Sequence, residues 1–284
     1  MSLVWINGTL IDKADARVSP FDHGFLYGDG AWAHFRAFNG KLFRPESQLG
    51  MLYHTLSHQL GIEISLTWDQ LKSAIETTLH ANNRTEGYIR VLVTRGPGTL
   101  GPDPRKLDPQ IIILAEEYHP FPIELYEYGL HAAIASNVFD PANIYYGSTL
   151  GALYLVLAKQ AALRSGCLEA VILHRDQAVR GIEGFLFLVR GGKIHQLSVG
   201  YDVLPEVVLE LADAQGIPVE RDLGISLTMN KLHDLIGSEE IFLAGTTCGV
   251  IAIISIDKKP IGSGTEGPVT RQIREAYRRL TRGE

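Results

Sequence analysis

The chain has 284 residues, a length that fits one large domain or two smaller ones. Its composition, 45% hydrophobic and 20% charged, is ordinary for a soluble globular protein, and its net charge of -6 with scattered basic residues argues against a nucleic-acid partner. No apolar run approaches the roughly 20 residues that a membrane span needs, and no secretory signal pattern is evident, so a cytoplasmic protein without a membrane partner is expected.

The first third of the chain is predicted to alternate strands with helices. Two Asn-Gly pairs, Asn7-Gly8 and Asn39-Gly40, each predict the turn of a β-hairpin. Thr67 is predicted to cap a helix, because Asp69 and Gln70 follow in its first turn. The predicted strands are Leu3–Ile6, Thr9–Ile11, Ala33–Phe38, Lys41–Arg44, Gly87–Thr94 and Gln110–Glu116, and the predicted helices cover 45–60 and 67–82.

The Pro120-Phe-Pro122 stretch is the best candidate for a linker, since two prolines resist helix formation and stiffen the backbone. The sequence therefore predicts two α/β domains, a smaller one at 1–119 and a larger, strand-rich one at 125–284, joined by a linker at 120–124. In the second domain strands are predicted at Leu130–Ser136, Ala170–His174, Phe185–Val189, Lys193–Gln196, Glu240–Ala244 and Val250–Ile256, and helices at Leu150–Ser165, Leu204–Gln215 and Val269–Leu280.

Two stretches of the first domain have residues suited to chemistry. Asp22–Gly30 holds three glycines among ionisable residues, which fits either a tight structural turn or a site where backbone approaches a ligand. Arg90 and Arg95 flank the end of a predicted buried strand, where they could hold a carboxylate in bidentate fashion or act as structural arginines. His34, on a strand with Trp32, is more typical of a half-buried histidine than of a catalyst.

Two further stretches lie in the second domain. Thr246 and Thr247, in the turn at 243–249, could hold an anion together with free amides, although a plain polar turn explains them equally well. The loop at 262–268 is predicted to lead into the last helix. Two cysteines and ten dispersed histidines form no disulfide framework and no metal-ligand spacing, so no metal site is expected.

Taken together, these stretches resemble the class IV aminotransferases, the fold type IV pyridoxal-phosphate enzymes that include branched-chain aminotransferases, D-amino acid transaminases and aminodeoxychorismate lyase. The resemblance implies a two-domain α/β fold, a homodimer and a role in amino-acid metabolism. It covers about residues 4 to 278 in the family's order and spacing. The matching motifs are Phe21–Gly30, Tyr88–Arg90, Val93–Gly96, Leu100–Arg105, Leu157–Gln160, Gly245–Thr247 and Ile261–Pro268.

The chain departs from the family at the lysine that binds the cofactor. In the family this lysine precedes the alanine-lysine pair that matches Ala158-Lys159, and the family's spacing places it at Ser148, or at Gly147 if the register slips by one. No lysine occurs between Lys106 and Lys159, so no local realignment supplies one. The covalent link to pyridoxal phosphate is therefore expected to be lost.

Three more departures concern the same cofactor. Where the family has a glutamate that pairs with the pyridine nitrogen, this chain has Arg180, and a cation there opposes ring protonation. The family's phosphate-binding arginine corresponds to Met51. Its glycine-isoleucine-threonine phosphate turn corresponds to 202–204, where Asp202 would repel a phosphate. We therefore expect no cofactor, although pyridoxal phosphate is the one that the family uses.

Three functions stay open from the sequence. The first is a pseudoenzyme that binds another small, anionic ligand or a partner in the inherited cleft. The second is a repurposed enzyme that uses His34, Ser148 or Arg180 without the cofactor. The third is an active aminotransferase or lyase, with a non-covalent cofactor or a lysine such as Lys231 brought from elsewhere. Ser148 and Arg180 are the candidate catalytic positions, and the candidate ligand-binding residues are Trp32, His34, Arg95, Arg105, Thr246 and Thr247.

Overall fold

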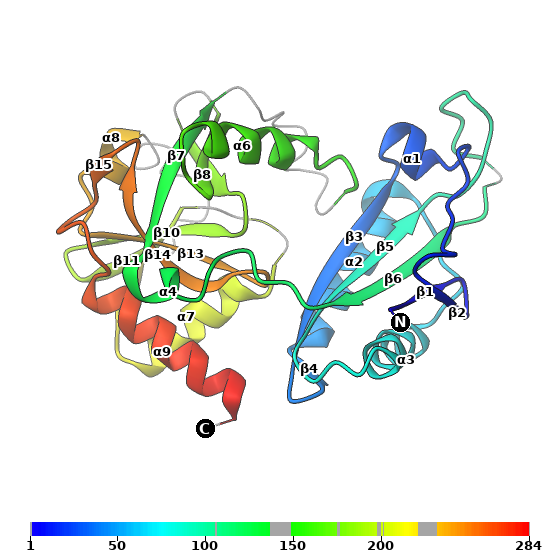
Figure 1. The fold of residues 1–284 in the computed structure, drawn as a ribbon, viewed down its shortest axis with the longest axis horizontal. Coiled ribbons are helices and arrows are strands. Elements are labelled where there is room, and N and C mark those ends of the chain that lie inside the picture. Colours follow the sequence, from blue (N-terminus) through cyan, green and yellow to red (C-terminus); the bar gives the residue numbers. More distant parts are fainter. Residues whose placement is uncertain are drawn as a thin grey trace. The chain divides into compact units, whose positions relative to one another are not determined.

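The computed structural model describes residues 2–105, 107–136, 149–174, 177–197, 200, 202–220 and 232–283. The chain forms two compact units. Unit 1 takes in Met1–Tyr118 together with Ala142–Ala152, and unit 2 takes in His119–Pro141 together with Leu153–Glu284. Figure 1 shows the elements of each unit.

Unit 1 contains a six-stranded antiparallel sheet in the order β2-β1-β6-β5-β3-β4. Its strands are β1 (Leu3–Ile6), β2 (Thr9–Asp12), β3 (Gly30–Phe38), β4 (Lys41–Leu42), β5 (Gly87–Thr94) and β6 (Gln110–Glu116). Both predicted hairpins are confirmed. Asn7 and Gly8 have φ angles of 47° and 97°, and Asn39 and Gly40 have 52° and 74°, the left-handed backbone that a two-residue hairpin turn requires.

The helices of unit 1 are α1 (His23–Tyr27), α2 (Pro45–His54) and α3 (Trp68–Ala81), with a π-helical segment η1 (Thr55–Leu60) directly after α2. The predicted cap of α3 is confirmed, because the Thr67 hydroxyl accepts from the Gln70 N–H while the Gln70 side chain accepts from the Thr67 N–H. The predicted strand 41–44 is too long. Arg44 adopts a left-handed φ of 48° directly before α2, which ends the extended conformation of the chain.

The core of unit 1 lies between one face of the sheet and helices α2 and α3. Alternate residues of β3, such as Ala31 and Phe35, are fully buried there against Leu49 of α2 and Ile75 of α3. The opposite face of β3 therefore carries Trp32 and His34. Residues 149–152 also belong to this unit, since the Leu150 N–H donates to the Gly30 carbonyl over 3.0 Å.

Unit 2 contains a nine-stranded mixed sheet in the order β12-β11-β10-β13-β14-β7-β8-β9, with β15 paired to β14. The strands among its described residues are β7 (Leu130–Ser136), β8 (Glu169–His174), β9 (Gln177–Gly181), β10 (Phe185–Arg190), β11 (Lys193–Gln196), β12 (Val219–Glu220), β13 (Glu240–Gly245), β14 (Gly249–Ile256) and β15 (Lys259–Pro260). The end strand β9 also contacts β10, so the sheet curves round its own core.

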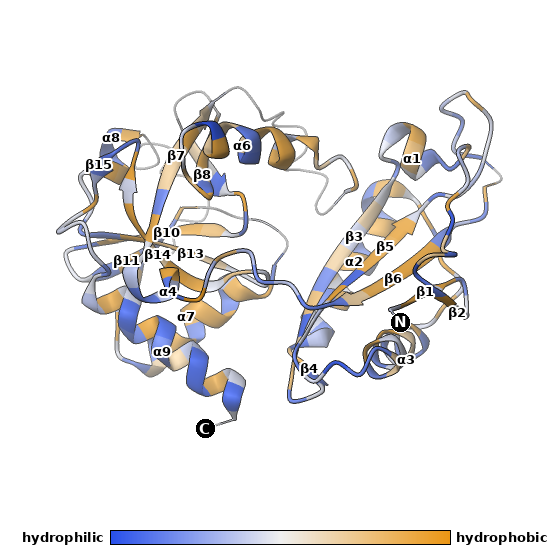
Figure 2. Ribbon diagram, viewed as in Figure 1, coloured by the Kyte–Doolittle hydropathy of each residue, from blue (hydrophilic) through white to orange (hydrophobic). Residues whose placement is uncertain are grey.

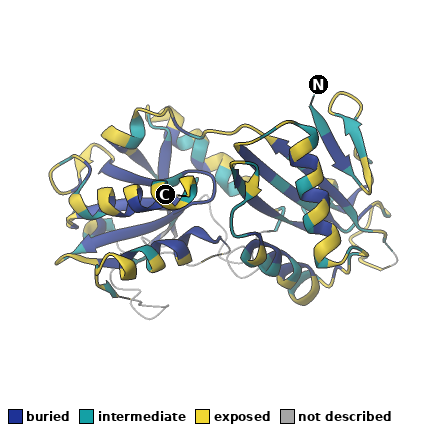
Figure 3. Ribbon diagram, turned by 90° about the horizontal axis from the view of Figure 1, so that it is seen from below, coloured by how far each residue is buried: buried dark blue, intermediate teal, exposed yellow. Residues whose placement is uncertain are grey.

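The helices of unit 2 cover different parts of this sheet. Among the residues that the structure describes they are α4 (Leu125–Tyr128), α6 (Leu153–Arg164), α7 (Leu204–Ala214), α8 (Leu232–Ile236) and α9 (Pro268–Arg282). Helix α6 packs its Ala158 and Ala162 on β7 and β8, whereas α7 and α9 pack against β13 and β14. Figure 2 shows apolar strands in the sheet and a mostly hydrophilic α9, and Figure 3 shows that the strands are buried. Phe121, in the predicted linker, is buried in the core of unit 2.

Candidate functional site

The glycine-rich stretch at 22–30 contains a short helix that the sequence did not predict. Asp22 caps α1, its Oδ1 accepting from the Gly24 N–H over 2.7 Å. Its Oδ2 accepts from the Thr94 hydroxyl over 2.8 Å, which fixes α1 to the end of β5. Because Asp22 is only 1% exposed, this carboxylate holds the fold together rather than facing a ligand.

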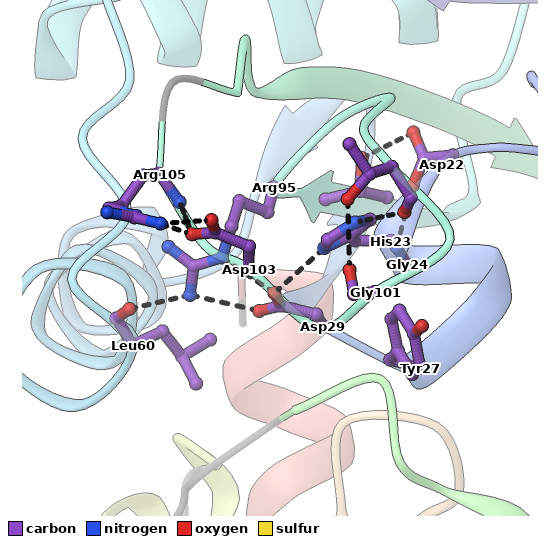
Figure 4. Close-up of polar contacts among 12 residues, drawn as sticks. Asp22, His23, Gly24, Tyr27, Asp29, Leu60, Arg95, Gly101, Asp103 and Arg105 are labelled. Carbon is purple, nitrogen blue, oxygen red and sulfur yellow. Dashed lines mark hydrogen bonds and ion pairs between the residues drawn. The ribbon is translucent and has the colours of Figure 1, made fainter.

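Arg95 lies beside this helix and pairs with Asp29. Its Nε donates to Asp29 Oδ2 over 2.6 Å and its Nη2 to Oδ1 over 3.0 Å, a bidentate geometry (Figure 4). The same Nη2 donates to the Leu60 carbonyl at the end of η1 over 2.8 Å. These contacts join three segments of unit 1, which supports the structural alternative for Arg95. Its predicted role in ligand binding stays a prediction.

Arg105 lies on the loop that follows β5 and is 81% exposed at its side chain. Its Nε and Nη2 donate to the two carboxylate oxygens of Asp103 over 2.8 and 2.6 Å, and these bonds lower the pKa of Asp103 (Figure 4). The ion pair is local to the loop and open to solvent, so it contributes little to stability.

Trp32 and His34 lie on the face of the unit 1 sheet opposite the core. Their rings meet edge to face with centroids 4.8 Å apart. The Arg90 guanidinium lies 4.9 Å from the Trp32 ring centroid, and its Nη2 donates to the Tyr88 hydroxyl over 2.8 Å. The Trp32 Nε1 donates to the Thr149 carbonyl over 3.0 Å. The register of β3 and β5, with His34 opposite Arg90, brings these side chains together.

Arg180 lies at the end of β9 in unit 2 and is half-buried. Its Nε donates to the Gly181 carbonyl over 2.9 Å, and its guanidinium lies 4.9 Å from the Phe185 ring centroid. Across the described part of the chain, no carboxylate pairs with this guanidinium. Arg180 is therefore a cation that a ring and the main chain hold in place, with hydrogen-bonding capacity left for an anion.

Thr246 and Thr247 begin the turn between β13 and β14, and both already have partners within unit 2. The Thr246 N–H and hydroxyl donate to the Asp202 carboxylate over 3.0 and 2.8 Å, and the Thr247 hydroxyl donates to the Glu183 carbonyl over 2.7 Å. Asp202 Oδ1 also accepts from the Leu204 N–H at the start of α7 over 2.8 Å. The anion that this turn holds is thus a carboxylate of the chain itself.

Sequence reasoning missed a buried acid beside this turn. Glu169 begins β8, is fully buried, and accepts from the N–H groups of Ala170 and Ile182 over 2.7 Å each and of Glu183 over 3.3 Å. Burial raises its pKa to about 7. Burial and nearby carboxylates also raise the pKa of Cys248 well above its usual value. A lone glutamate between a cysteine and an apolar strand gave no signal in the sequence.

Several positions that the sequence analysis singled out lie in other parts of the chain or outside the described residues. Ser148, Gly147 and Lys231 lie outside the described residues. Met51 lies on α2, in unit 1. A surface cavity of about 1200 Å³ in unit 1, lined by residues between Asn39 and Thr85, includes none of the predicted site residues. Within the described ranges no His, Cys, Asp and Glu side chains cluster as a metal site would require, and no helix is long and apolar enough to span a membrane.

Comparison with known proteins places the chain in a family. The family model for class IV amino-transferases matches residues 34–256. A putative branched-chain-amino-acid aminotransferase of Methanocaldococcus jannaschii is 34% identical over 283 residues, covering 97% of this chain and 95% of that protein. A D-alanine aminotransferase of Bacillus licheniformis is 27% identical over 285 residues, covering 96% of this chain and 95% of that protein.

A solved structure shows the same likeness. The branched-chain amino acid aminotransferase of Escherichia coli matches with a TM-score of 0.89 at 24% identity, covering 100% of this chain and 95% of that chain. This match confirms the predicted two-domain α/β fold of the fold type IV aminotransferases. With the family model matching most of its length, the chain belongs to the class IV aminotransferase family.

Proposed function

We propose that this family member does not carry out pyridoxal-phosphate-dependent transamination and instead binds a small anionic ligand through Arg180. The observation that carries the proposal is the half-buried Arg180 guanidinium, stacked on Phe185 with no described carboxylate to neutralise it. A partly desolvated cation is costly to leave unpaired, and a planar guanidinium matches a carboxylate or phosphate with two parallel hydrogen bonds.

The residues present do not fit the family's cofactor. Arg180 opposes protonation of the pyridine nitrogen at the position where the family has a glutamate. Asp202 fills the hydrogen-bonding turn at which the family binds the phosphate. Met51 is uncharged, whereas the family has an arginine at this position that binds the cofactor's phosphate. The proposed function therefore includes no reaction of pyridoxal phosphate.

Lys159, the lysine that follows the family's cofactor-binding position most closely in sequence, does not supply a substitute. Its Nζ donates to the Leu168 carbonyl over 2.6 Å and lies 5.8 Å from the Phe121 ring centroid. An ammonium held in this way serves to join α6 to the start of β8. An enzyme that uses His34, Ser148 or Arg180 without the cofactor stays the second hypothesis from the sequence.

A calorimetric titration of the protein with glutarate tests ligand binding at Arg180. We expect Arg180→Gln to weaken glutarate binding by about 10- to 100-fold, because a charge-assisted pair is lost. Arg190→Gln in the same unit, whose Nη2 donates to the Asp234 carbonyl, serves as the matched control. Equal affinities in the wild type and Arg180→Gln would contradict the proposal.

The same preparation, mixed with pyridoxal phosphate and then borohydride, tests the loss of the cofactor. We expect an absorbance spectrum equal to that of the protein plus free cofactor, and no cofactor attached to the protein after reduction. The full-length identity of 34% with a putative aminotransferase favours the alternative of an active enzyme. A cofactor fixed to the protein by borohydride would establish that alternative.

We also propose that the chain forms a homodimer, as the resemblance implies. Helix α6 exposes Leu153, Val156 and Leu157 by 67%, 63% and 41%, and their spacing places them on one side of the helix. Light scattering is expected to give twice the chain mass of 31.3 kDa, and Val156→Glu to shift the protein towards the monomer. Leu280→Glu on α9 is the control, and a wild-type monomer would refute the proposal.

The predicted cytoplasmic location stays a prediction.

A further inference from the structure

The turn between β13 and β14 meets the first turn of α7 around a single carboxylate. Asp202 is 5% exposed, and among the described residues its two oxygens accept hydrogen bonds of 2.8 to 3.0 Å from Leu204 and Thr246. The donors are the main-chain N–H of Leu204, the main-chain N–H of Thr246 and the Thr246 hydroxyl. The turn between β13 and β14 and the start of one helix thus supply hydrogen-bond donors that Asp202 already occupies.

The donors themselves are of the kind that binds a phosphate or a carboxylate. The first N–H groups of an α-helix have no partner within the helix, and the partial positive charge at a helix start favours an anion. Helix α7 has 11 residues, and the residue before it, Val203, makes no side-chain cap, so the Asp202 carboxylate fills that role from one residue earlier. The Thr246 N–H and hydroxyl then complete the shell from the other side.

The surroundings make a second anion unfavourable while Asp202 is present. Burial raises the pKa of the Cys248 thiol, and the nearby Glu183, Glu169 and Asp202 side chains raise it further, so Asp202 lies among other acidic side chains beside this turn. A phosphate arriving here would meet a buried negative charge and donors that are already satisfied.

We infer that Asp202 is a built-in anion that occupies the hydrogen-bond donors of Leu204 and Thr246, so that these donors bind an external phosphate group only when the Asp202 side chain is removed. This inference explains why the turn at Gly245–Thr247 keeps its family sequence while the cofactor is not expected to bind. A tethered carboxylate competes at a high effective concentration, so we expect phosphate binding in Asp202→Ala to be about 100-fold tighter than in the wild type.

The test measures thermal unfolding of the full chain in inorganic phosphate, with chloride at the same ionic strength as the reference. Asp202→Ala is expected to unfold at a lower temperature than the wild type in chloride and to recover part of that loss in phosphate. Asp202→Asn is the matched control, since its amide fills the same space without charge and should gain nothing from phosphate. The wild type is likewise expected to show no gain.

Two results would overturn the inference. One is a wild type that phosphate stabilises as much as it does Asp202→Ala, and the other is an Asp202→Ala protein that phosphate leaves unchanged. If the alanine variant does not fold, Asp202→Ser and a phosphate titration of the wild type by calorimetry provide the same comparison. Glutarate binding by the wild type and by Arg180→Gln tests the role of Arg180 separately. A negative result in the phosphate experiment would therefore not count against the proposed function.

Discussion

Replacing Gly96 by alanine is expected to lower the free energy of unfolding by about 3 to 5 kcal/mol. Gly96 has a φ of 100°, and a Cβ atom there would lie 1.9 Å from the carbonyl oxygen of Asp108. The neighbour is main chain and cannot turn aside as a flexible side chain would. Gly96 also accepts at its carbonyl from the His23 N–H, so its displacement would disturb the attachment of α1.

Gly8 gives a matched control within the same unit. Its φ of 97° is nearly the same, but no atom lies within 4 Å of the position a Cβ would take. Gly8→Ala therefore carries only the backbone cost, about 1 to 2 kcal/mol. Urea unfolding of both variants separates steric overlap from backbone strain. Equal losses in the two variants would show that the Asp108 carbonyl moves away at little cost.

The pH dependence of stability is expected to report Glu169. In the unfolded chain this carboxyl has its usual pKa near 4.5, and in the folded protein its pKa is about 7 because it is fully buried. Between these values the folded state binds more protons, so the free energy of unfolding falls as pH rises through this window. The contribution is complete below pH 4.5 and lost above pH 7, an effect of about 3 kcal/mol.

Glu169→Gln isolates this effect. The glutamine Oε1 can still accept from the Ala170 and Ile182 N–H groups, as Glu169 Oε1 does, but the side chain does not titrate. The difference in unfolding free energy between the wild type and Glu169→Gln should therefore grow in favour of the variant from about pH 5 to about pH 8. Glu124→Gln, an exposed position in the same unit, is the control. Parallel curves for the wild type and Glu169→Gln would contradict the raised pKa.

Elements with strong local signals could be predicted from the sequence. Hairpins at Asn7-Gly8 and Asn39-Gly40 formed as expected because left-handed turn residues decide them locally. Helix α3 formed because Thr67 and Gln70 cap it. Helix α1 was missed, since three glycines hide a helix that depends on the Asp22 cap and its bond to Thr94. Strand β9 was missed because its five residues are held mainly by pairing with β8.

The candidate site was predictable only in part. The sequence singled out Arg180 and Asp202 as departures from the family, and it predicted that Asp202 would repel a phosphate. It could not show that Asp202 accepts from Leu204 and Thr246, because those donors lie on separate segments that only the tertiary fold brings together. The raised pKa of Glu169 could not be predicted from the neighbouring residues in the sequence either, because it results from complete burial in the folded chain.

Unit 1 is built from two separate stretches of the chain, which limits how the chain can be divided. Residues 149–152 return to this unit after the chain has already begun unit 2, and they bond to Gly30 and Trp32 along β3. A fragment that stops at Tyr118 lacks them and leaves that edge of β3 without its partner. Neither unit is a single stretch of sequence, so recombination that exchanges one unit as a continuous cassette would break the other.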